Sequence, residues 1–81
     1  MEDRLSDIKG LEIYSPKGIF VGMSDEFIID VEGMRVEGIF VDEVNPYVAE
    51  EGISIRIPMD WVQSIGDVII LNRFPNDRIS I

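Results

Sequence analysis

Alternating and continuous apolar runs divide this chain into short segments of strand character. The alternation is clearest over residues 53–58, where apolar and polar side chains take turns from Ile53 to Ile57 before Pro58 ends the segment. A half-buried strand has this period of two. A continuous apolar run within residues 67–72 predicts the last main strand, and the pattern as a whole predicts an all-β chain.

A β-hairpin is predicted from two longer apolar segments, residues 19–31 and residues 34–44. Both are rich in β-branched and aromatic residues, and only Glu32 and Gly33 separate them. Two segments of this kind, joined by two residues that include a glycine, are typical of a tight hairpin turn.

In each arm of this hairpin the alternation of apolar positions shifts by one residue at a glycine, Gly22 in the first arm and Gly38 in the second. In the second arm Met34 lies on the same phase as Val36, whereas Ile39 lies on the other. A change of phase at a glycine indicates a bulge, and bulged strands bend enough to help close a small barrel. We therefore expect a β-barrel of five to six strands.

The segment after Pro58 holds the only tryptophan of the chain. One or two helical turns between Pro58 and Gly66 would place Trp61 and Ile65 on one face, with Val62 beside them. This spacing predicts a plug over an open end of the barrel, and it disfavours the alternative of a surface tryptophan that awaits a ligand. The residues expected in the core or plug are Val21, Gly22, Gly38, Pro58, Trp61, Val62, Ile65 and Gly66.

Length, charge and the absence of cysteine narrow the class of protein. The 81 residues suffice for one domain, residues 1–81. The absence of cysteine excludes a disulfide framework. The formal charge of −9 disfavours direct binding to nucleic acid, whose phosphates are bound by cationic side chains. No stretch has the length of a membrane span, and the acidic N-terminus is unlike a secretory signal, so a cytoplasmic protein without membrane insertion is expected.

Catalytic and cofactor chemistry find little support in the residue types. The chain has neither histidine nor cysteine, so none of its serines has an imidazole partner. The acidic pairs Asp25-Glu26 and Asp42-Glu43 are neighbours in strand-like segments, where adjacent side chains point to opposite faces. Phosphate-binding glycine motifs are absent. We expect no enzyme activity, no cofactor and no metal, but a surface that binds another protein or another copy of the chain.

A set of glycine, apolar and acidic residues follows a known order and spacing: Gly18, Val21, Gly22, Ile29, Asp30, Ile57, Pro58, Val62, Ile65, Gly66, Asp67 and Ile69. With these residues the chain resembles the PRC-barrel domain over about residues 5–72. This domain is named after the cytoplasmic part of the H subunit of photosynthetic reaction centres and also occurs in a bacterial ribosome-maturation factor. The resemblance implies the barrel as the core, with residues 73–81 as a tail outside it.

The resemblance also implies a class of function. Short stand-alone members of the family are similar to archaeal proteins that act in cell division as adaptors to the tubulin-like division ring and its membrane anchor. A homo-oligomer, either a dimer or an open chain, that is recruited from the cytoplasm to the division site is therefore expected. The alternative is an accessory factor in ribosome maturation or RNA processing that works through a ribosomal protein.

Apolar residues beside the first bulge depart from the family pattern. Positions flanking the Val-Gly pair are commonly polar, whereas this chain has Ile19, Phe20 and Met23, and Ser24 takes a core-like position. If the other inward positions hold, Phe20 and Met23 project outward. Exposed apolar clusters often mark interaction sites, so self-association or partner binding is expected here, unless a shifted register buries these residues.

The tail, residues 73–81, carries three further apolar residues, Phe74, Ile79 and Ile81, on a segment that Pro75 bends. Three outcomes are open for it. It folds back as an extra edge strand, which we favour; it binds a neighbour; or it stays disordered. The three apolar tail residues complete the expected interaction surface.

Overall fold

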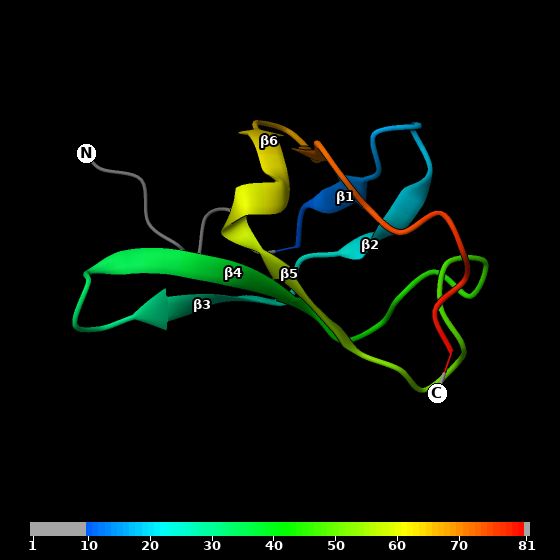
Figure 1. The fold of residues 1–81 in the computed structure, drawn as a ribbon, viewed down its shortest axis with the longest axis horizontal. Helices are drawn as coiled ribbons and strands as arrows, with labels where there is room; N and C mark the ends of the chain where they lie inside the picture. Colours follow the sequence, from blue (N-terminus) through cyan, green and yellow to red (C-terminus); the bar gives the residue numbers. More distant parts are fainter. Residues whose placement is uncertain (1–9, 81) are drawn as a thin grey trace.

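The computed structural model describes residues 10–80, and within them the fold is all-β, as the sequence predicts (Figure 1). Within this part of the chain one turn of 3-10 helix interrupts the strands. Seven short strands fall within this part of the chain, where five or six were expected. The elements are β1 Glu12–Tyr14, β2 Phe20–Met23, β3 Glu26–Asp30, β4 Arg35–Val41, β5 Ile55–Pro58, η2 Met59–Trp61, β6 Val62–Ile65 and β7 Ile69–Leu71.

The strands form two sheets, one with the order β2-β1-β7-β6 and one with the order β3-β4-β5. In the larger sheet β1 and β7 run parallel, with Ile13 opposite Ile69, so strands from the two ends of the described chain pair at its centre. All other strand pairs are antiparallel. Because β7 can pair only after the rest of the chain has returned to β1, the larger sheet depends on contacts distant in sequence.

The first predicted hairpin arm is wrong as a single strand. It breaks at Ser24 and Asp25 into β2, which belongs to the larger sheet, and β3, which belongs to the smaller one. The Ser24 N–H donates to Leu11 O (2.8 Å), whereas the next N–H, that of Asp25, donates to Phe40 O (2.9 Å). Consecutive residues thus bond to different sheets, and the chain turns the corner between them.

Both predicted bulges are present. The register of β1 and β2 shifts beside Gly22, and the register of β3 and β4 shifts beside Gly38. The hairpin turn itself is longer than the two residues expected, because the last pair of the ladder joins Asp30 to Arg35. Met34, expected to face inward, lies in this turn with 84% of its surface exposed and with a φ of 54°.

Gly38 and Gly22 allow β4 and its continuation to approach both sheets closely. A Cβ on Gly38 would lie 2.6 Å from Ile57 O of β5, and a Cβ on Gly22 would lie 2.9 Å from Glu43 O. Neither distance leaves room for a side-chain atom. Beyond Val41 the chain reaches β2 through a bridge between Gly22 and Val44, which joins the two sheets into a barrel-like fold.

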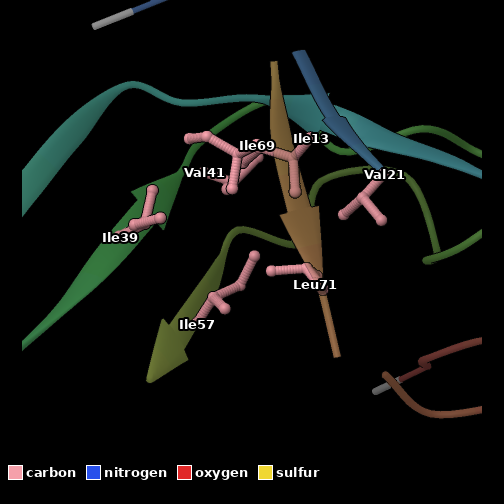
Figure 2. Close-up of a cluster of buried hydrophobic side chains, with 7 residues drawn as sticks. All are labelled: Ile13, Val21, Ile39, Val41, Ile57, Ile69 and Leu71. Atoms are coloured by element: carbon pink, nitrogen blue, oxygen red, sulfur yellow. The ribbon is translucent and has the colours of Figure 1, made fainter. Parts of the chain in front are cut away.

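Seven aliphatic side chains from five strands fill the space between the sheets and point toward one another (Figure 2). Each is at most 1% exposed. Burial of such side chains from water is the main favourable contribution to folding, and a chain of this size has only a thin core to supply it. The seven residues are Ile13, Val21, Ile39, Val41, Ile57, Ile69 and Leu71.

The segment after Pro58 differs from the predicted plug in its local structure. Its helical part ends at Trp61, and Val62–Ile65 forms strand β6, which pairs with β7. Trp61 nevertheless packs against the buried core, as do Val62 and Ile65. Pro58, at the end of β5, and Gly66, in the β6–β7 turn, are exposed, so these two expected core residues are wrong.

The close approach at Gly38 gives a direct test. We expect Gly38→Ala to lower the free energy of unfolding by about 1–3 kcal/mol, because the added methyl group displaces the β5 backbone. Gly66→Ala is the matched control, since its Cβ would meet no atom within 4 Å, and it should change the free energy by less than about 0.5 kcal/mol. Urea unfolding of both variants measures the difference, and equal losses would contradict the packing described here.

Candidate interaction surfaces

The apolar residues beside the first bulge are divided by the structure into exposed and covered side chains. Ile19 and Met23 are exposed, Met23 by 44%. Phe20 is half-buried, because its ring meets the Tyr14 ring edge-on with 5.8 Å between the centroids. The expected outward strip is therefore open at its two ends and covered in the middle.

Tyr14 is held over Phe20 by an exposed hydrogen bond on β1. Its hydroxyl donates to Glu12 Oε1 (2.9 Å). This bond to the carboxylate, with smaller contributions from desolvation and from the Glu12 charge, raises the pKa of Tyr14 above its ordinary value. The neutral phenol is thus the form that the arrangement favours.

Ser24, which takes a core-like position beside Met23, is buried with its polar groups bonded. The Leu11 N–H donates to Ser24 Oγ (2.9 Å), and the Gly10 N–H donates to Ser24 O (2.8 Å). A buried hydroxyl is tolerated because it accepts from a backbone donor that would otherwise need another partner. The hydrogen bonds of Ser24 therefore stabilise the corner between the sheets, and its hydroxyl is not placed as a reactive group.

The tail folds back on its own chain. The Phe74 ring meets Trp61 edge-on, with 6.4 Å between the centroids. Ile79 bridges Ala49 in parallel: its N–H donates to Val48 O (2.8 Å), and its carbonyl accepts from the Glu50 N–H (2.7 Å). The tail thus adds a single bridge in place of a full edge strand. Ile81 lies outside the described residues.

A cavity of about 300 Å³ opens between the tail, the turn before β2 and the loop after Val44. Phe74 and Ile19 give it apolar walls, and the exposed ring of Tyr47 stands beside it. We call this cavity the tail pocket. Its lining residues include Lys17, Ile19, Tyr47, Arg73, Phe74 and Arg78.

The tail pocket gathers positive charge on an acidic protein. Residues 10–80 contain five Lys and Arg side chains, and three of them, Lys17, Arg73 and Arg78, line this pocket beside the single carboxylate of Asp77. Arg78 is fixed by donation from its Nε to Pro46 O (2.8 Å). Arg56, one of the two remaining cations, forms an ion pair with Glu37 (4.0 Å). This is the one ion pair within the described part of the chain, and neither of its residues lines the pocket.

A second hollow, of about 370 Å³, lies at the other end of β2 and has the opposite charge. Met23 and Phe20 supply apolar surface, and Asp25, Asp42 and Glu43 supply carboxylates. We call it the acidic hollow. Residues of both acidic pairs of the sequence line this hollow. Residues 10–80 nevertheless contain no cluster of three or more acidic side chains placed to hold a metal ion.

The turn between β3 and β4 carries exposed apolar side chains that the hydrophobic pattern does not predict. Val31 is 77% exposed and Met34 is 84% exposed, with Glu32 between them in sequence. We call Val31, Glu32 and Met34 the hairpin tip. The signal was the apolar character of a turn, since turn positions usually hold polar residues or glycine. An assumed two-residue turn instead assigned Met34 to the barrel interior.

Comparison with known families matches residues 1–77 to the PRC-barrel domain. No curated protein matches the chain. Domains of this family are small modules of the protein-interaction type and are not catalytic. Within residues 10–80 no helix has both the length and the apolar character needed to cross a membrane.

The packing of the tail on the plug gives a second test. We expect Phe74→Ala to lower the free energy of unfolding by about 1–3 kcal/mol and to shift Trp61 fluorescence to longer wavelength, because the indole loses its aromatic neighbour and gains water. Arg73→Ala is the adjacent control and should leave the emission unchanged. An unaltered Trp61 spectrum in Phe74→Ala would show that the tail does not cover the indole.

Proposed function

This chain belongs to the PRC-barrel domain family, and we propose that it is an adaptor or regulator in archaeal cell division that acts without catalysis. It self-associates, and it binds proteins of the tubulin-like division ring or the protein that anchors this ring to the membrane. The chain works in the cytoplasm and is recruited to the division site by these partners.

The observation that carries the proposal is the exposed Met23 beside the acidic hollow. An apolar side chain rimmed by carboxylates is the arrangement of an interface with an apolar centre and a polar edge. Asp25, Asp42 and Glu43 supply the rim. The partner surface that fits it has an apolar contact surrounded by Lys or Arg side chains, and opposite charges speed the encounter of two such surfaces.

The partner is a protein and not a nucleic acid. The formal charge of −9 repels phosphate backbones, and the three cations of the tail pocket surround one small cavity and form no continuous basic stripe. A basic face on a division protein would meet the acidic hollow without this repulsion.

Affinity capture from native archaeal cells tests the function, with the wild-type chain and two variants as baits. We expect wild type to recover proteins of the division ring or its anchor, and Met23→Ser to recover about tenfold less, as for loss of one central apolar contact. Ile29→Ser is the matched control, since Ile29 is 46% exposed against 44% for Met23 but lies on β3. Recovery of ribosomal proteins in place of division proteins would contradict the proposal.

A further inference from the structure

We propose that the hairpin tip of one copy docks into the tail pocket of a second copy and so links the chains head to tail. The inference rests on the self-association in the proposed function and names the two surfaces that perform it. It concerns different residues from Met23 and the acidic hollow, which remain available to other partners.

The conformation of Met34 indicates that its side chain is kept for a contact outside its own barrel. A φ of 54° places this residue in the left-handed region, which is unfavourable for a residue with a bulky side chain. The side chain gains no burial in return, because 84% of its surface is exposed. A positive φ closes the β3–β4 turn, but glycine would close it without strain, so an exposed methionine at this position points to a contact made by its side chain.

The tail pocket has the size and the walls for such a side chain. Its volume of about 300 Å³ lies at the small end of the roughly 300–1,000 Å³ typical of ligand pockets, so it suits one or two side chains and not a folded element. Phe74 and Ile19 offer apolar contact to Met34 and Val31. Thioether groups also make favourable contacts with aromatic rings, which Phe74 and Tyr47 provide.

The charges of the two surfaces are complementary. In the turn, the side chains of Asp30 and Arg35 both lie over Gly33, so their charges offset each other and Glu32 gives the tip its net negative charge. In the pocket, Lys17 and Arg73 have no carboxylate partner within the described residues. Insertion of the tip would bring Glu32 to these cations while the apolar side chains enter the cavity.

The two surfaces lie at opposite ends of the molecule, so each copy keeps a free tip or a free pocket after one contact has formed. The longest axis spans 38 Å, and Figure 1 shows the β3–β4 turn at one end of it and the tail with the loop of residues 45–52 at the other. One copy therefore cannot fill its own pocket with its own tip. A contact between two different surfaces at opposite ends repeats from copy to copy and gives a linear chain in place of a closed dimer.

Sedimentation velocity over a range of concentrations tests the proposal with the full chain. Wild type should show a sedimentation coefficient that rises continuously with concentration and falls again when salt screens the charges. The tip variant, Met34→Gly with Glu32→Gln, and the pocket variant, Arg73→Glu, should each associate at least about tenfold more weakly. Met34→Gly alone should weaken association while leaving the free energy of unfolding equal or higher, because glycine relieves the strain.

Mixing the two variants gives the decisive result. The tip variant keeps an intact pocket and the pocket variant keeps an intact tip, so an equimolar mixture should form one-to-one dimers and nothing larger. If wild type assembles and each variant alone assembles as strongly as wild type, this docking is overturned but self-association stands. A wild-type chain that stays monomeric at every concentration would overturn self-association as well.

Discussion

Close backbone contact along one strand determines the architecture. β4 pairs with β3 and β5, and its continuation then reaches β2, so one stretch of chain belongs to both sheets. Gly38 and Gly22 make this possible, because a Cβ at either position would occupy space that backbone atoms already fill. The bulges beside these glycines supply the bend. Without the two contacts the sheets would separate and expose the aliphatic core.

Because aliphatic side chains fill the interior, the candidate functional groups lie on the outside of the molecule. The interior is filled by seven aliphatic side chains, and the indole of Trp61 and the ring of Phe74 cover part of it from outside. Little interior volume is left for a ligand. Some of the polar and apolar groups that remain exposed gather in the acidic hollow, the tail pocket and the hairpin tip, where they can meet another macromolecule.

How much the sequence predicts depends on whether a feature is local. The alternation ending at Ile57 and the glycines at the two bulges are local, and both identify real elements. The break at Ser24 is not local, since its polar groups are satisfied by Leu11, which no period in the sequence connects to it. The tail pocket is still less accessible, because Lys17, Tyr47 and Arg73 come from three separate segments. Charge gathered by folding leaves no motif in one stretch of chain.

The most direct measurement of binding through the two ends of the barrel is hydrogen–deuterium exchange followed as the protein concentration rises. Amides of residues 29–36 and of the tail, residues 73–79, should exchange more slowly at high concentration, while those of β1 and β7 exchange equally slowly at every concentration. Exchange that does not depend on concentration at the two ends, or protection that grows in the central strands β1 and β7, would contradict assembly through these surfaces.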